Sequence, residues 1–111
     1  MSKIVEYVEK NHRKNISLAN TAKIFGYDYF YFSKIFNSIF LMSFNDYLNT
    51  YRFNDACQML IETDMTITEI ASESGFKSIR NFNHVFKKLS GASPQEYRNM
   101  YTVHLDNSAE T

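Results

Sequence analysis

The sequence has very few of the residues that interrupt helices. It contains one proline and three glycines among 111 residues, while hydrophobic residues make up 44% of the chain. This composition argues against long flexible stretches and favours helices packed around a core. At this length the core can belong to one compact domain or to two small lobes that share a helix.

Cysteine and long apolar runs are equally scarce. The one cysteine, Cys57, cannot form an internal disulfide, which is consistent with a reducing cytoplasm. Because no run of about eighteen apolar residues is present, we expect no membrane span. The stretch MSKIVEYVEK carries charges among its apolar positions, so we also expect no signal peptide. These absences predict a cytoplasmic protein.

The chain also lacks net charge, because 12 Lys and Arg residues balance 12 Asp and Glu residues. This balance weighs against a simple polyanion binder, since nucleic-acid-binding domains are usually basic. The charges are nevertheless sorted along the sequence. Residues 77–88 hold four basic side chains and no acidic one, whereas acidic residues gather at Glu62, Asp64, Glu69, Glu73, Asp106 and Glu110.

The chain contains an internal repeat. Shifting the first half by 49 residues places Ala22 on Ala71 and Gly26 on Gly75. Beyond the glycine the shift becomes 50, and it pairs Phe32, Ile35, Phe36, Ile39 and Tyr47 with Phe82, Val85, Phe86, Leu89 and Tyr97. The first four of each set have the i, i+3, i+4, i+7 spacing of a helix packed on one side. We interpret the pattern as a duplication, because chance would not align all these positions.

Capping signals divide the repeat into helices. Residues suited to N-caps stand at Ser17, Asp28, Thr66 and Ser78, and the stretches TITE (66–69) and SPQE (93–96) are capping boxes. Pro94 occupies the first helical position after the second box. The predicted fold class is all-α, with seven helices near residues 3–12, 18–25, 29–39, 44–62, 67–74, 79–89 and 94–100.

A short helix that ends in glycine and is soon followed by another helix is typical of the helix-turn-helix. Glycine supplies the left-handed turn conformation, which costs other residues about 1 kcal/mol or more. An ordinary helical hairpin would explain one copy as well, but two copies in one register favour the helix-turn-helix. We therefore expect a duplicated, homeodomain-like helix-turn-helix domain over residues 1–101. Its lobes lie near 3–42 and 63–100, and its joining helix lies near 43–62. A polar tail follows the domain at 102–111.

The helix faces opposite the apolar quartets are the candidate site. They carry Phe30, Ser33, Lys34 and Asn37 in the first copy and Arg80, Asn83, His84 and Lys87 in the second. Most of these are hydrogen-bond donors: Arg suits guanine, Asn suits adenine, and an exposed Phe can contact a thymine methyl. A solvated surface histidine would equally explain His84, and charges that favour the helix dipole would explain Lys87 and Lys88.

The predicted joining helix has the length that two DNA-reading lobes require. Its 19 residues would span about 28 Å at 1.5 Å per residue. Successive major-groove faces of B-DNA lie roughly 34 Å apart. One chain could thus place two recognition helices in neighbouring major grooves. Because the two reading faces differ, the DNA site should be asymmetric and about two helical turns long.

Taken together, these residues resemble the DNA-binding domain of the AraC/XylS (arabinose-operon regulator) family. The resemblance is strongest in ITEIASESGFKSIRNFNHVFKKLSGASPQEYR (67–98) and continues in YFSKIF (31–36) and SFNDYLNTYRFNDACQML (43–60), covering about residues 3 to 100. It implies a two-lobed domain that regulates transcription initiation in bacteria, most often as an activator, with RNA polymerase as a partner. Most members join this domain to a sensing or receiver domain, so we expect an excised C-terminal module or a small stand-alone regulator.

The resemblance also assigns base-reading positions. They fall on Phe30, Ser33 and Lys34 in the first copy and on Ile79, Arg80, Asn81 and His84 in the second. With neighbouring polar and basic residues, the candidate DNA-binding set is Phe30, Ser33, Lys34, Asn37, Lys77, Ser78, Ile79, Arg80, Asn81, Asn83, His84, Lys87 and Lys88. One departure is Leu41, which stands where the second copy has Gly91. Because leucine resists a left-handed cap, we expect the first recognition helix to end differently.

Two other classes of function compete with DNA binding. A thiol enzyme could use Cys57 with His12, His84 or His104, but Cys57 lies in a row of core positions, where an inert cysteine is expected. The histidines lack metal-ligand spacing and no glycine-rich phosphate loop is present, so we expect no metal, no cofactor and no enzymatic activity. The remaining rival is a protein-interaction module without specific DNA binding, which the neutral charge favours slightly.

Overall fold

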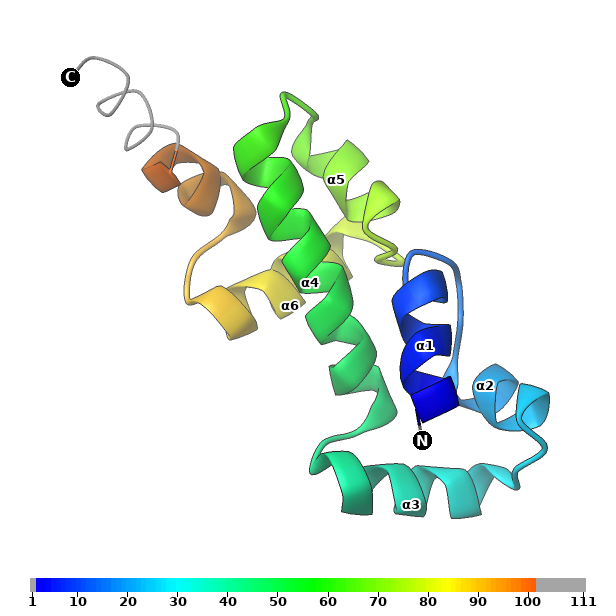
Figure 1. The fold of residues 1–111 in the computed structure, drawn as a ribbon. Helices are drawn as coiled ribbons and strands as arrows, with labels where there is room; N and C mark the ends of the chain where they lie inside the picture. Colours follow the sequence, from blue (N-terminus) through cyan, green and yellow to red (C-terminus); the bar gives the residue numbers. More distant parts are fainter. Residues whose placement is uncertain (1, 102–111) are drawn as a thin grey trace. The chain divides into compact units, whose positions relative to one another are not determined.

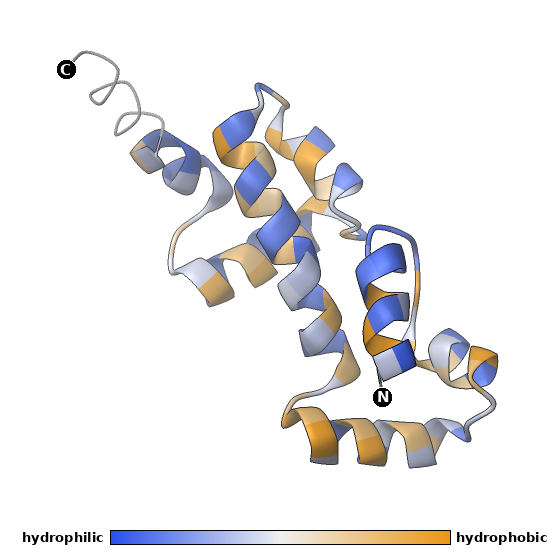
Figure 2. Ribbon diagram, in the orientation of Figure 1, coloured by the Kyte–Doolittle hydropathy of each residue, from blue (hydrophilic) through white to orange (hydrophobic). Residues whose placement is uncertain are grey.

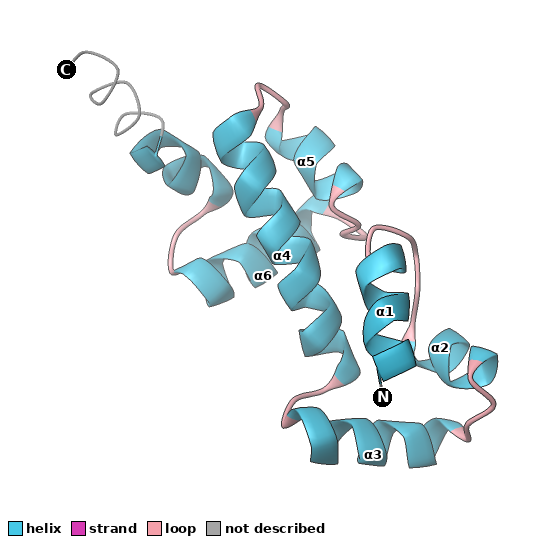
Figure 3. Cartoon of the chain, viewed as in Figure 1, coloured by secondary structure: helices cyan, strands magenta, loops and turns pink. Residues whose placement is uncertain are grey.

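The computed structural model describes residues 2–101, and within that range it contains helices and loops but no strand (Figures 1 and 3). The helices are α1 (Ser2–Asn11), α2 (Leu18–Ile24), α3 (Tyr29–Phe40), α4 (Phe44–Glu62), α5 (Ile67–Glu73), α6 (Ile79–Ser90) and a last helix over 94–101. All seven predicted helices are confirmed, with ends that differ by one residue at most. The predicted tail at 102–111, with His104, Asp106 and Glu110, lies outside the described residues.

The chain divides into two compact units, unit 1 up to Tyr51 and unit 2 from Arg52 onward. The division falls inside α4, so this helix contributes residues to both units. Each unit has its own group of buried apolar side chains, and the two groups share no residue. The two copies of the sequence repeat thus correspond to two separately packed structures.

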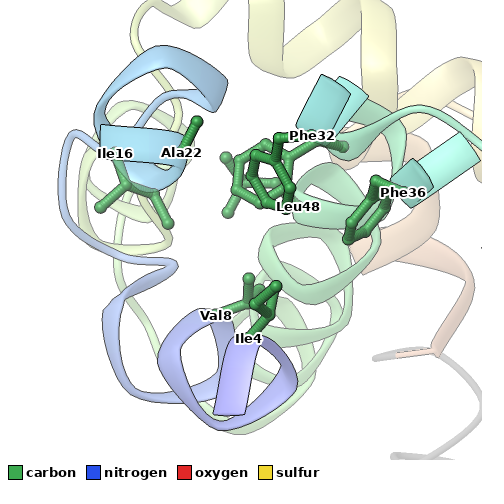
Figure 4. Close-up of a cluster of buried hydrophobic side chains, with 8 residues drawn as sticks. Ile4, Val8, Ile16, Ala22, Phe32, Phe36 and Leu48 are labelled. Carbon is green, nitrogen blue, oxygen red and sulfur yellow. The ribbon is translucent and has the colours of Figure 1, made fainter. Parts of the chain in front are cut away.

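Unit 1 is packed around aromatic rings from α3 and α4. Phe36 is fully buried, and its ring centroid lies 6.0 Å from that of Phe32, 5.4 Å from that of Phe44 and 5.3 Å from that of Tyr47. Aliphatic side chains of α1, α2 and the loop between them complete the core (Figure 4): Ile4, Val8, Ile16 and Ala22. Helix α1 alternates hydrophilic and hydrophobic colours along its length, as expected of a helix with one buried side (Figure 2).

Unit 2 repeats this design with fewer rings. Phe82 and Phe86 of α6 are fully buried, as are their equivalents Phe32 and Phe36 in unit 1. The last helix packs on them through Tyr97, whose ring centroid lies 5.2 Å from that of Phe86. It is also tied to the end of α4, because Arg98 donates hydrogen bonds to the carbonyl oxygens of Leu60 and Thr63, at 3.0 and 3.1 Å. These bonds satisfy carbonyls that the end of a helix leaves unpaired.

The two turns have the same backbone structure, as the repeat predicted. Gly26 and Gly75 both have positive φ, 75° and 100°. In unit 1 the N–H of Tyr27 donates to the carbonyl of Ala22 at 2.8 Å, and in unit 2 Phe76 donates to Ala71 at 3.0 Å. This bond, with a second one from each glycine N–H to the carbonyl three residues earlier, forms a Schellman motif, which requires the left-handed residue that glycine supplies.

The predicted caps are confirmed. The side chains of Ser17, Asp28, Thr66 and Ser78 each accept hydrogen bonds from backbone N–H groups in the first turn of the helix that follows. The capping box at 93–96 is complete in both directions. The N–H of Glu96 donates to Ser93 Oγ at 3.1 Å, and the N–H of Ser93 donates to Glu96 Oε1 at 3.0 Å.

The expectation for Leu41 is wrong. Leu41 takes the left-handed conformation, with φ 59° and ψ 26°, and its N–H donates to the carbonyl of Asn37. Gly91 ends α6 in the same way, with φ 81° and a bond to the carbonyl of Lys87. The two recognition helices therefore end alike. The common chain path imposes this conformation on Leu41, whose side chain lies in solvent with 87% of its surface exposed.

The apolar quartets are also not uniformly buried. Their first three members pack inward, but Ile39 is 54% exposed and Leu89 is 47% exposed. Both stand in the last turn of their helices. In α3 the ring that packs there belongs to Phe40, whose centroid lies 4.2 Å from that of Phe36 in a stacked geometry. Periodicity identifies the buried side of a helix but not where along the helix the burial ends.

Candidate nucleic-acid interface

The outward side of α6 is a polar face that carries several basic side chains. Arg80, His84 and Lys87 lie roughly half a turn away from the buried Phe82 and Phe86, and all three side chains are exposed. Asn81, Asn83 and Lys88 flank them and are exposed too. Each of these side chains carries a hydrogen-bond donor, and His84 carries one in either tautomer of its neutral ring. Donors at this spacing can reach base edges and phosphates along one groove.

The outward side of α3 has the same geometry with different chemistry. Phe30, Lys34 and Asn37 lie opposite the buried Phe32 and Phe36 and are exposed, and Ser33 beside them is half-buried. The Asn37 amide donates to the carbonyl of Ser33 at 3.0 Å, so this donor group points back to its own helix. Lys34 is the one cation among these four residues.

Three of the candidate residues lie at the start of α6. Ser78 is its N-cap, and its hydroxyl oxygen accepts from the N–H of Asn81 at 3.0 Å. Lys77 and Ile79 stand on either side, both exposed. These three residues also line one side of a shallow pocket of about 210 Å³ between α5 and α6. Ser78 therefore has a structural role first, and any DNA contact would be additional.

A carboxylate, that of Glu96, interacts electrostatically with Lys87 on this face. The N–H of Ser93 and then its side chain hold the pKa of Glu96 below its ordinary value, and the charge of Lys87 adds to this effect. Lys87 therefore sits near a permanently ionised carboxylate at neutral pH. Its neighbours His84 and Arg80 lie about one and two turns further toward the start of the helix, respectively.

The structure reveals exposed aromatic residues that the sequence set leaves out. Tyr27, Tyr29 and Tyr31 are 44%, 45% and 56% exposed, around the start of α3. Phe30, between them, is 77% exposed. The signal in the sequence is the run YDYFYF (27–32), in which only Phe32 belongs to the apolar quartet.

The thirteen predicted residues thus form two groups. One group lies on α3 in unit 1, and the other lies on α6 and the turn before it in unit 2. Cys57 is half-buried and not fully buried as expected, and burial raises the pKa of its thiol, which disfavours the reactive thiolate. Among residues 2–101 no three His, Cys, Asp or Glu side chains gather that could hold a metal ion. No helix in that same range is long and apolar enough to cross a membrane.

A short capped helix, a Schellman turn on glycine and a second helix with an exposed polar face define a helix-turn-helix domain, and this chain contains two. The family model of the helix-turn-helix domain matches residues 21–100. The chain belongs to this family, and specifically to its AraC type. The predicted family and the all-α, duplicated fold are both confirmed.

Relatives and solved structures agree with this assignment. YtdP of Bacillus subtilis (strain 168), an uncharacterized HTH-type transcriptional regulator, is 34% identical over 95 residues, which are 86% of this chain and 12% of YtdP. The chain therefore spans about an eighth of the length of this relative. The C-terminal domain of the response regulator yesN from Fusobacterium nucleatum is 28% identical, with a TM-score of 0.83 and coverage of 87% of this chain and 95% of that one.

A third comparison concerns the fold alone. The DNA-binding domain of AdpA, a global transcriptional factor solved in complex with a target DNA, is 22% identical to this chain. Its TM-score is 0.87, and the match covers 93% of each chain. The two chains therefore share a fold.

Proposed function

We propose that this chain binds duplex DNA sequence-specifically, with α3 and α6 as its two recognition helices. The observation that carries the proposal is the exposed donor face of α6, where Arg80, His84 and Lys87 lie opposite the buried Phe82 and Phe86. A helix presented in this way fits the major groove, where guanidinium, amide and imidazole donors distinguish base pairs. Bacterial DNA is cytoplasmic, so the proposed function belongs in that compartment.

The proposed DNA site is asymmetric and about two helical turns long, and one chain occupies it. Helix α4 has 19 residues and hence a length of about 28 Å. That length supports binding in adjacent major grooves, whose centres lie roughly 34 Å apart. The difference between the two faces supports the asymmetry, because Phe30 and Arg80 hold equivalent positions and select bases by different chemistry.

The test has three steps. Titration of random-sequence duplex at low and moderate salt measures non-specific binding, and selection from a random library then yields the preferred sequence. Footprinting and the molecular mass of the complex finally give its extent and stoichiometry. We expect a one-to-one complex that protects about two turns. A protected region shorter than about one and a half turns, or an obligatory dimer on DNA, would overturn the two-groove proposal.

The proposal extends to regulation of transcription. We infer an activator that contacts RNA polymerase when bound beside a promoter, within a longer protein whose sensing domain lies elsewhere. The regulators that share this domain and the small share of YtdP that it covers support this inference. Transcription from a template that carries the selected site, with and without the protein, separates activation from repression.

A second candidate function is binding to another protein. The zero net charge favours it, and so do the exposed apolar side chains Ile39, Leu41 and Met42 at the end of α3. The titration distinguishes the two candidates directly. A chain that shows no preference for any duplex at low salt, while it remains folded, would support the interaction module.

A further inference from the structure

The start of α3 carries an unusual concentration of exposed aromatic rings. Phe30 is 77% exposed, and Tyr27, Tyr29 and Tyr31 are each 44% to 56% exposed. Four exposed rings within five successive residues are costly for a small domain, because each presents apolar surface to water. We call these four residues the aromatic cluster.

The rings of the aromatic cluster are held in place. The centroids of Tyr29 and Phe30 lie 5.2 Å apart with an edge-to-face angle of 86°, and those of Tyr27 and Tyr31 lie 6.1 Å apart. Tyr27 also stacks on the buried Phe32, with centroids 5.7 Å apart and an angle of 16°. The backbone beneath is fixed, because Asp28 Oδ2 accepts hydrogen bonds from the N–H groups of Phe30 and Tyr31. Such a surface is preorganised and loses little entropy on contact.

Two of the equivalent backbone positions in unit 2 carry side chains with hydrogen-bond donors. A shift of 50 residues places Tyr29, Phe30 and Tyr31 on Ile79, Arg80 and Asn81. Both helices begin with a capped turn and end with a left-handed residue, so the two sets occupy equivalent places. At the outermost position a guanidinium in α6 is replaced by a phenyl ring in α3. That ring has no donor or acceptor for a base edge.

We propose that α3 recognises thymine through its C5-methyl group, with Phe30 as the contacting residue and the rest of the aromatic cluster as its support. Thymine is the one base that presents an apolar group in the major groove, so an apolar side chain on a recognition helix can select it. This inference rests on the proposed DNA binding. It assigns the two units different chemistry, with methyl contact in unit 1 and hydrogen bonds and phosphate contacts in unit 2.

Replacement of thymine by deoxyuridine tests the proposal, because it removes the methyl group and keeps every hydrogen-bonding atom. In the selected site each thymine is replaced in turn, and affinity is measured for the unaltered protein and for Phe30→Ala. We expect one or two replacements to weaken binding by about three- to fivefold, the effect of one buried methyl group. The same replacements should have no effect on Phe30→Ala, whereas Phe30→Leu should restore part of the sensitivity.

Two further measurements separate methyl contact from other causes. Lys34→Ala, one turn along the same face, should weaken binding and shift its salt dependence while the deoxyuridine effect remains. The deoxyuridine effect itself should not change with salt, since no charge is involved.

Several results would overturn the inference. If replacement of thymine by deoxyuridine weakens the binding of Phe30→Ala as much as that of the unaltered protein, the effect comes from DNA shape. If Phe30→Ala binds every duplex with unchanged affinity, the aromatic cluster serves contact with a protein. Specific binding without any deoxyuridine effect removes this inference and leaves the proposed function standing, whereas absence of specific binding removes both.

Discussion

Leu41 and Gly91 occupy the same place in the two units and offer a direct measure of backbone strain. Leu41→Gly should stabilise the protein by about 0.5–1 kcal/mol, because relief of the left-handed leucine exceeds the entropy that glycine loses. The exposed side chain contributes little packing that could be lost. Gly91→Leu should destabilise by a similar amount. A Cβ at Gly91 would meet no atom within 4 Å, so only the backbone conformation resists it.

Thermal or urea melts of the two variants and the unaltered protein decide this prediction. We expect the melting midpoint to rise in Leu41→Gly and to fall in Gly91→Leu. A variant that carries both substitutions should have roughly the original stability. A loss of stability in Leu41→Gly would mean that the leucine makes contacts that its exposure does not suggest.

Arg80 and Lys88 are expected to separate base reading from phosphate binding. Arg80 lies near the start of α6 at the outermost position, where a guanidinium can reach a base edge. Arg80→Ala should therefore cost about 1–3 kcal/mol on the preferred sequence and relax the preference at one or two positions. Lys88, near the end of the helix, should contact a phosphate of the DNA backbone. Lys88→Ala should weaken all sequences alike and lower the salt-dependence slope by about one unit.

Both variants are compared on preferred and scrambled duplexes across a salt series. Lys10→Ala, which removes an exposed lysine from α1, serves as the control for charge. If Arg80→Ala lowers affinity equally on both duplexes, Arg80 is a phosphate contact, and the specificity of unit 2 must come from Asn81, His84 or DNA shape.

The capping box at 93–96 makes the last helix sensitive to acid. Hydrogen bonds from Ser93 hold the pKa of Glu96 below its ordinary value. A depressed pKa stabilises the fold above the ordinary glutamate pKa of about 4.3, and this stabilisation is lost as the pH falls through the lower folded value. Glu96→Gln should therefore melt at a lower temperature than the unaltered protein at pH 7. The difference in melting temperature should disappear at a pH below both the folded and the unfolded pKa of Glu96.

Melting temperatures of the two proteins from neutral to acid pH test this behaviour. Asp64→Asn, outside the helices, gives the effect of the same change in net charge. A gap between the unaltered protein and Glu96→Gln that stays constant down to the lowest pH would show that the ionised carboxylate adds nothing to the cap.

Helices, caps and turns were predictable because the residues that determine them are neighbours in the sequence. Asp28 caps α3 through N–H groups two and three residues away, and Gly75 alone provides the conformation its turn requires. The conformation of Leu41 was not predictable, because the chain path overrides the preference of the residue. The exposure of Ile39 depends equally on how far other helices extend, which no local pattern contains.

The candidate site was predictable in part for the same reason. Register along a helix identifies its outward side, and every residue placed there from the sequence is at least partly exposed. The tyrosines of the aromatic cluster were missed because aromatic residues in a hydrophobic stretch suggest a core. Their exposure follows only from the packing of unit 1, whose interior is already filled by Phe32, Phe36 and Phe44.

The two separate cores lead to a prediction for the molecule as a whole. Phe36 and Phe86 are both fully buried, one in each core, and they are equivalent in the repeat. Phe36→Leu and Phe86→Leu should each cost about 1–2 kcal/mol through lost packing. Because no buried residue is shared between the cores, each loss should fall mainly on its own unit.

Amide hydrogen exchange in the two variants measures where stability is lost. Protection should fall in α1, α2 and α3 for Phe36→Leu and in α5, α6 and the helix at 94–101 for Phe86→Leu. DNA binding gives a second readout, since Phe36→Leu should weaken the preference for the bases that α3 contacts and leave the Arg80-dependent preference intact. An equal loss of protection throughout the chain in both variants would show that α4 couples the units into one cooperative structure. The two recognition helices would then fold and unfold together.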